Sequence, residues 1–271
     1  MANIDKIVEN IRKKTENANG TIGIILGHCF NDFLEYIDNK IEIPFKDISG
    51  LKVLGSDVDE NKLVFGSIYN KKVIVLIGRV HYSLGYEVDD IATPIYLLKE
   101  LGCQKLILCS SVGAINHKIK VGDIVTFVDQ INLTGRNPLI GAEITRYGHK
   151  FIDMIEPYNN DIINILLNTA KQEMGIKVKK GVVVEFPGPT AETVSETKFA
   201  SMIGADVIGF NNCCEAIAAK YCNLPLVSYA LVTNHASAFT NTKVKHEDIV
   251  YNRKCASSYY LELLARFIKK L

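Results

Sequence analysis

Apolar and polar residues follow two periods along the chain, and the two alternate from one end to the other. Residues 4–18 carry apolar side chains at helical spacing, which predicts a surface helix. Continuous apolar runs bounded by turn residues instead predict buried strands at Thr21–Leu26, Lys105–Ser110, Asp206–Phe210 and Pro225–Val232. The chain is therefore expected to alternate strands with helices.

The remaining segments fit the same alternation. Leu63–Tyr69 and Lys72–Ile77 predict a hairpin that turns at Asn70-Lys71, and Val88–Leu101 predicts a helix closed by Gly102. Further helices are expected at 31–37, 162–174, 214–222 and 248–270, and a further strand at 123–129. Residues 132–160 form the longest irregular stretch, and a loop of this length usually serves function or assembly.

Such alternation is typical of the α/β class, with a central mixed, mostly parallel β-sheet flanked by helices. The sequence contains no linker, no shift of composition and no internal repeat. We therefore expect one domain that spans residues 1–271.

Charge and composition exclude several classes of partner. The net charge is +1, from 31 basic and 30 acidic residues, so no broad basic field attracts nucleic acid or a membrane surface. The apolar runs are too short to span a bilayer, and the amino terminus lacks the apolar core of a secretory signal. Seven scattered cysteines without a CxxC pair predict reduced thiols. We expect a cytoplasmic protein.

The sequence lacks several well-known motifs for metal binding, nucleotide binding and serine hydrolysis. The sequence has no HExxH, no Cys/His cluster at metal spacing, no Walker loop and no GxGxxG. Gly-x-Ser-x-Gly is also missing, which disfavours a serine hydrolase.

The stretch Val182–Val194, VVVEFPGPTAETV, has the most distinctive pattern. A β-branched run breaks at Pro187-Gly188-Pro189 and resumes as a predicted helix whose first turn carries Glu192. Two prolines around a glycine impose a stiff turn, and ligands bind at the carboxyl ends of strands in open α/β sheets. Glu192 either holds a ligand there or interacts favourably with the N-terminal dipole of the helix.

Several other polar residues also follow predicted strands, so we expect them on one rim of the sheet. They are His28, Arg79, His81, Ser110, Ser111, Glu192, Asn211 and Asn234. Arg79 and His81 suit an oxyanion such as phosphate, whereas Glu192 and Asn234 can read the edge of a heterocycle that carries donors and acceptors. Each residue alone also has a structural reading, as an ion pair, a cap or a packing residue. Their shared position favours the functional reading.

Over nearly all of its length the chain resembles the trimeric purine nucleoside phosphorylases of the nucleoside phosphorylase superfamily. The motifs that carry the resemblance are GRVHYSLGY (78–86), VGDIVTFVDQINLTGRNPL (121–139), RYGHKF (146–151), FPGPTAETVSE (186–196), IGADVIGF (203–210) and VTNH (232–235). The resemblance implies phosphorolysis, in which a nucleoside and orthophosphate give a free base and a pentose 1-phosphate. It implies no metal and no organic cofactor, with inorganic phosphate as co-substrate.

The resemblance also implies roles for individual residues. Arg79 and His81 would hold phosphate, near the backbone of Ser111. Glu192 would accept a hydrogen bond from N1–H of a 6-oxopurine, and Asn234 would lie at O6 and N7, so that His81, Glu192 and Asn234 form the catalytic set. His246 would lie near the 5′-hydroxyl. The resemblance further implies a homotrimer in which Phe151 closes the sugar site of a neighbouring subunit.

Several positions depart from the family pattern in the phosphate and sugar subsites. His28 and Asn211 stand where the family has phosphate-binding serines, and Ser83 and Phe210 replace a tyrosine and a methionine at the sugar. Ala191 replaces the phenylalanine that packs against the purine. The imidazole of His28 either adds positive charge for phosphate or fills the pocket and excludes it.

Three hypotheses follow. The first is a purine nucleoside phosphorylase that acts on nucleosides of the inosine and guanosine type. The second is a divergent homologue with an altered acceptor or substrate, either a nucleoside hydrolase or a phosphorylase of modified nucleosides. The third is a non-catalytic nucleoside-binding protein. All three bind small molecules, a purine nucleoside and, in the first, phosphate.

Overall fold

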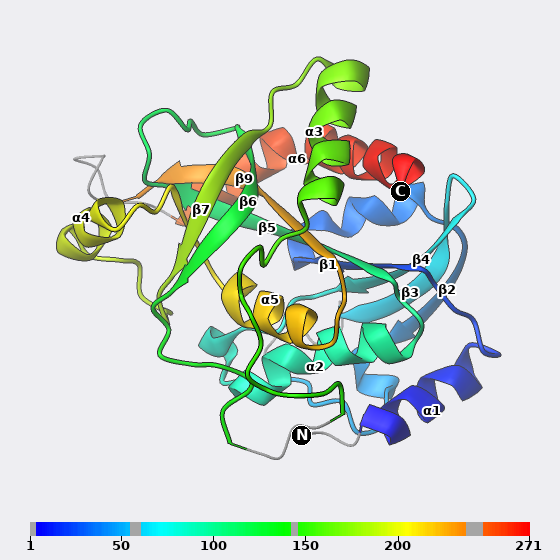
Figure 1. The fold of residues 1–271 in the computed structure, drawn as a ribbon. Helices are drawn as coiled ribbons and strands as arrows, with labels where there is room; N and C mark the ends of the chain where they lie inside the picture. The colour runs from blue at the N-terminus through cyan, green and yellow to red at the C-terminus, as the bar shows by residue number, and fades with distance from the viewer. Residues whose placement is uncertain (1–3, 55–60, 142–145, 237–245) are drawn as a thin grey trace. The chain divides into compact units, whose positions relative to one another are not determined.

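The structure is a computed structural model that describes residues 4–54, 61–141, 146–236 and 246–271 (Figure 1); the side chains of His28, Cys29 and His246 lie outside the description. The chain divides into two compact units, each assembled from separate segments. The first unit comprises Met1–Leu108, Arg136–Ile155 and Cys214–Leu226, and the second comprises Cys109–Gly135, Glu156–Cys213 and Val227–Leu271. The expectation of one domain over 1–271 stays a prediction.

The first unit contains a sheet flanked by helices. Its elements are α1 (Ile4–Lys14), β1 (Ile22–Leu26), β2 (Asp38–Pro44), β3 (Lys62–Ile68), β4 (Lys71–Ile77) and α2 (Val88–Glu100), with the start of β5 (Lys105–Ala114) and most of α5 (Asn212–Tyr221). The strands lie in the order β2-β3-β4-β1-β5. β1 runs parallel to β4 and β5, whereas β3 is antiparallel to β2 and β4.

Local chemistry explains the boundaries in this unit. The predicted face of α1 is buried at Ile4, Ile7, Val8 and Ile11. α2 begins with a capping box between Glu87 and Asp90 and is followed by Gly102, whose φ of 100° favours glycine. The predicted hairpin is confirmed, but it turns at Tyr69 and Asn70, one residue before the predicted Asn70-Lys71, because Ile68 pairs with Lys71 and the two turn residues adopt positive φ.

The second unit also contains a sheet flanked by helices. Its elements are the end of β5, β6 (Ile124–Asn132), α3 (Asn160–Met174), β7 (Lys179–Glu185), α4 (Val194–Met202), β8 (Val207–Gly209), most of β9 (Leu226–His235) and α6 (His246–Lys270). The strands lie in the order β5-β8-β7-β6-β9. β7 runs parallel to β6 and β8, whereas the pairs β5–β8 and β6–β9 are antiparallel.

Helices α3 and α6 pack side by side within this unit (Figure 1). Tyr260, Leu264 and Phe267 of α6 are almost fully buried. An apolar cluster includes residues of β7, α4 and β8, and its members are Ile115, Val184, Ala200, Ala205, Ile208 and Ala236. Burial of these side chains fixes the strands that carry the polar residues of the second unit.

The α/β class with a mixed sheet and flanking helices is confirmed. The edge strand β2 was not predicted, because most of its residues are exposed and polar and give no apolar run. Residues 31–37 lie mainly in a 3₁₀ segment, His28–Tyr36, that is interrupted at Phe30, instead of the α-helix expected there. Among the described residues of 133–159, as predicted, there is no helix or strand.

Candidate functional site

Glu192 lies just before helix α4 and not in its first turn, so that prediction is wrong. The physical reason is the capping box that starts at Thr193. The Thr193 side chain accepts from the backbone N–H of Glu196 at 3.2 Å, and the Glu196 carboxylate accepts from the backbone N–H of Thr193 at 2.7 Å. Glu196 therefore supplies the negative charge at the helix N-terminus, which leaves Glu192 for another role.

The carboxylate of Glu192 is half-buried, and one of its two oxygens is unsatisfied. Its Oε1 is buried and has no hydrogen-bond partner in the part of the chain that the structure describes. Burial raises the pKa of this carboxyl group, a hydrogen bond from its own backbone N–H partly opposes that shift, and the charge of Glu196 raises the pKa further. A buried acceptor without a donor is costly, so the group is suited to receive an N–H donor from a ligand.

The turn before Glu192 packs against Phe210. Gly188 has a φ of 60°, and a Cβ at this position would lie 3.1 Å from Cε1 of Phe210. Glycine is therefore needed both for the backbone conformation and for the close approach. The Phe210 side chain is 40% exposed, and Ala191, beside Glu192, is exposed as well. The turn thus places one predicted sugar residue against the segment that carries Glu192.

Asn234 lies inside β9, whereas the apolar run had indicated that it follows a strand. The strand continues because Ala236 N–H donates to the Ala114 carbonyl at 2.9 Å. The Asn234 amide accepts from the Thr233 hydroxyl at 3.0 Å and donates to the His235 carbonyl at 3.2 Å. A Cβ on Gly113 would lie 2.9 Å from Asn234 Nδ2, so Gly113 leaves the room that this amide occupies.

Ser110 and Ser111 lie well inside β5, whereas the sequence placed them where this strand ends. β5 extends to Ala114 because its last residues pair with β8, with Gly113 opposite Ile208. Ser110 is buried and its hydroxyl donates to Oδ1 of Asn212 at 3.4 Å, whereas Ser111 is half-buried.

Asn211 connects β8 to α5 in a strained turn. Its φ is 66°, in the left-handed region that asparagine tolerates better than most residues, and it is only 3% exposed. The next residue, Asn212, donates from Nδ2 to the Phe210 carbonyl at 3.0 Å. This bond closes the turn that carries both Phe210 and Asn211.

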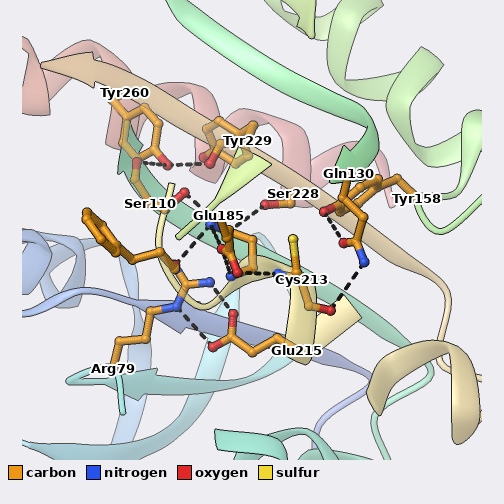
Figure 2. Close-up of polar contacts among 12 residues, drawn as sticks. Arg79, Ser110, Gln130, Tyr158, Glu185, Cys213, Glu215, Ser228, Tyr229 and Tyr260 are labelled. Carbon is orange, nitrogen blue, oxygen red and sulfur yellow. Dashed lines mark hydrogen bonds and ion pairs between the residues drawn. The ribbon is translucent and has the colours of Figure 1, made fainter. Parts of the chain in front are cut away.

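Glu185, which sequence reasoning did not single out, is the centre of a polar network at this turn (Figure 2). Its carboxylate is fully buried and accepts from the backbone N–H groups of Asn212 and Cys213, the latter at 3.0 Å, and from Asn212 Nδ2 at 3.1 Å. Asn212 Oδ1 in turn accepts from the hydroxyls of Ser110 and Ser228, each at 3.4 Å. The available signal was one carboxylate at the end of the apolar run VVVEF.

In the first unit, Arg79 forms a buried ion pair with Glu215 (Figure 2). Nε of Arg79 donates to Glu215 Oε1 at 3.0 Å, and Nη2 donates to Oε2, so the pairing is bidentate. Burial raises the pKa of Glu215, and the charge of Arg79 opposes that shift. Sequence reasoning missed Glu215 as well, although a single acid within the apolar helix CCEAIAAK was a signal.

Other predicted residues of the first unit lie nearer the surface. His81 is half-buried and precedes a 3₁₀ turn, Tyr82–Leu84, in which Ser83 is exposed. Phe151 is 81% exposed, with its ring 5.3 Å from that of His149.

The structure thus gathers Ser110, Asn211 and Phe210 around one turn of the second unit. The side chains of His28 and His246 lie outside the described part of the chain. Convergence of residues from both units on one cleft stays a prediction. Within the described residues, no group of three His, Cys, Asp or Glu side chains is placed to hold a metal ion.

None of the described helices is long and apolar enough to cross a bilayer. The cytoplasmic location stays a prediction.

Comparison with known proteins gives consistent matches. A family model described as the phosphorylase superfamily matches residues 21–269. Purine nucleoside phosphorylase 1 of Geobacillus stearothermophilus is 28% identical over 250 residues, covering 92% of this chain and 91% of that protein. The purine nucleoside phosphorylase of Anopheles gambiae is 30% identical over 257 residues, covering 92% of this chain and 72% of that protein.

Solved structures match over almost the whole chain. The purine nucleoside phosphorylase of Schistosoma mansoni in complex with inosine has a TM-score of 0.93 at 29% identity, covering 99% of this chain and 96% of that one. Isoform 2 of the same organism's enzyme, in complex with cytosine and ribose-1-phosphate, has a TM-score of 0.94 at 28% identity, with the same coverage.

Proposed function

The chain belongs to the phosphorylase superfamily, and we propose that this enzyme catalyses the reversible phosphorolysis of 6-oxopurine nucleosides, of the inosine and guanosine type. A phosphate oxygen forms a bond to the anomeric carbon, the bond from that carbon to the base nitrogen breaks, and its electron pair leaves with the base. The base takes up, in net terms, the proton that hydrogen phosphate loses on becoming the ester, and it is released beside the pentose 1-phosphate.

One observation carries the proposal, the unsatisfied Oε1 of Glu192. A 6-oxopurine presents N1–H, a donor that satisfies this buried acceptor. A 6-aminopurine presents an unprotonated N1, an acceptor that repels an ionised carboxylate. The half-buried carboxylate therefore favours the 6-oxo edge whenever it is ionised. Solved relatives are bound to hypoxanthine and guanosine, and the Schistosoma mansoni enzyme also to adenosine, so these complexes support purine nucleosides as the substrate class and the choice of the 6-oxo edge rests on Glu192.

The other residues have roles that fit the charges of the reaction. Bond cleavage builds positive charge on the sugar and negative charge on the departing base, so groups that stabilise these charges act mainly in the transition state. The proposal assigns phosphate to Arg79 and His81, and assigns the N7 and O6 edge of the base to the Asn234 amide. Glu215 orients Arg79 by engaging two of its guanidinium nitrogens.

A panel of nucleosides assayed with and without phosphate tests the function. We expect inosine and guanosine to release base only when phosphate is present, with equal amounts of base and pentose 1-phosphate formed. Equal rates with and without phosphate would instead identify a hydrolase. Nucleoside binding by calorimetry without turnover would identify a binding protein.

We also propose a homotrimer, supported by exposed apolar side chains. In the first unit Phe151 is 81% exposed and Ile155 is 74% exposed. In the second unit Met202 of α4 is 85% exposed, and Phe199 of the same helix is 49% exposed. Exposed apolar side chains mark an interface where they form a contiguous patch, and Phe199 and Met202, three positions apart, share one face of α4.

The molar mass in solution tests this assembly. Light scattering after size exclusion should give three times the 30.1 kDa chain mass. Phe151→Ala should weaken nucleoside affinity if Phe151 completes a neighbour's sugar site. A monomer with full activity would overturn the proposal.

A further inference from the structure

The carboxylate of Glu185 occupies the N-terminus of helix α5. Both of its oxygens are engaged, because Oε1 accepts from the Asn212 backbone N–H and side chain and Oε2 accepts from the Cys213 backbone N–H at 3.0 Å. The side chain is completely buried. The first N–H groups of this helix are therefore satisfied by an anion that belongs to the protein itself.

Helix N-termini favour negative charge, because unpaired N–H groups and the helix dipole point towards it. α5 has ten residues, Asn212–Tyr221, and so has a full N-terminal turn. The neighbouring residue Gly209 leaves room for Asn212, the main hydrogen-bond partner of the carboxylate. A Cβ on Gly209 would lie 2.9 Å from Asn212 Nδ2 and 3.0 Å from Val183, so only glycine leaves room for this amide.

The segment held in this way carries two predicted site residues. Asn212 Nδ2 bonds to the Phe210 carbonyl at 3.0 Å as well as to Glu185, and between them Asn211 adopts a φ of 66°. Glu185 thus secures the turn through Asn212. A bound anion is not needed to order this turn, because the carboxylate already does so.

We propose that Glu185 is a specificity-determining residue that acts as an internal anion beside the acceptor subsite. Its charge holds the Phe210–Asn211 turn and at the same time weakens the binding of a phosphate dianion at Asn211, by like-charge repulsion in a buried setting. The inference rests on the proposed phosphorolysis, since it concerns the phosphate of that reaction. If Glu185 only supported the turn, its removal would loosen the site and weaken the binding of phosphate.

The sign of the change in phosphate affinity distinguishes these two roles. Inorganic phosphate binding is measured by calorimetry without nucleoside, for the wild type and for Glu185→Gln and Glu185→Met. We expect both variants to bind phosphate several-fold more tightly than the wild type. Glu185→Asp keeps the charge and should show no such gain. Equal or weaker binding by folded Glu185→Gln and Glu185→Met would overturn the inference.

A control and a second variant complete the test. Glu9→Gln removes an exposed charge from α1 and should leave phosphate affinity unchanged. Glu185→Gln keeps an acceptor oxygen for the N–H groups of Asn212 and Cys213, so this variant decides the matter if Glu185→Met fails to fold. Because no nucleoside is present, the result is independent of whether the wild type releases base.

Discussion

Two carboxylates of one short stretch, Glu185 and Glu192, differ in how well the protein satisfies their hydrogen-bonding capacity. Glu185 ends β7, is fully buried and accepts from two backbone N–H groups and one side-chain amide. Glu192 lies seven positions later, and its buried Oε1 has no partner among the described residues. The satisfied carboxylate of Glu185 stabilises the fold. The unsatisfied one is destabilising unless a ligand supplies the missing donor.

The two acids therefore differ in whether the protein supplies donors to their oxygens, and not in burial alone. Glu215 belongs with Glu185 in this respect, because the bidentate contact with Arg79 satisfies both of its oxygens. Removal of either structural acid should therefore destabilise the protein. Removal of Glu192 should not.

The largest expected effect comes from Glu215→Ala. Loss of one partner from a buried ion pair leaves an uncompensated charge on Arg79, which costs about 3–5 kcal/mol. Urea unfolding measures the loss as a lower transition midpoint. The exposed pair Glu9–Lys13 gives a matched control, and Glu9→Ala should leave the midpoint near that of the wild type. Similar midpoints for both variants would contradict the structural role of Glu215.

Glu185→Ala should have the next largest effect. It leaves the buried backbone N–H groups of Asn212 and Cys213 without their acceptor, and an orphaned donor costs roughly 1–3 kcal/mol. The same unfolding measurement should show a loss of that order. Amide hydrogen exchange should also become faster in the first turn of α5. Unchanged exchange in that turn would mean that Glu185 does not hold the helix.

Glu192→Gln should have the smallest effect and the opposite sign. The folded state raises the pKa of Glu192, so ionisation of this group opposes folding above that raised pKa. As the pH falls through the folded pKa and towards the unfolded value, the group takes up its proton and the penalty disappears. The neutral variant should therefore be slightly more stable than the wild type at neutral pH, and the gain should vanish in mild acid. Thermal unfolding in the absence of ligand across this pH range measures the gain in stability. A Glu192→Gln variant less stable than the wild type at neutral pH would contradict the account.

The fold could be predicted from sequence because apolar periodicity reports burial directly. The runs that became β1, β4 and β7 are continuous, and the spacing in α1 is helical. Edge strand β2 carries no such signal. The start of α4 was misplaced because TAETVSE contains two acids, and only the hydrogen bonds of Thr193 show that Glu196 completes the capping box.

The candidate site was predicted less completely. Arg79, Glu192 and Asn234 have side chains whose chemistry suggests a ligand, so the sequence could single them out, and their roles stay predictions. Glu185 and Glu215 act through partners distant in sequence, Asn212 and Arg79, and such pairings follow from the folded chain and not from local pattern. Charged residues inside apolar segments were the one available signal for them.

Calorimetric binding of hypoxanthine tests the role of Glu192 most directly. The wild type should bind the base, and Glu192→Gln should bind it more weakly by the roughly 1.5–3 kcal/mol that a hydrogen bond to a charged group contributes, about ten- to a hundred-fold in affinity. The difference should shrink as the pH falls and Glu192 becomes protonated. Equal affinities of wild type and variant at neutral pH would remove Glu192 from base recognition and contradict the account.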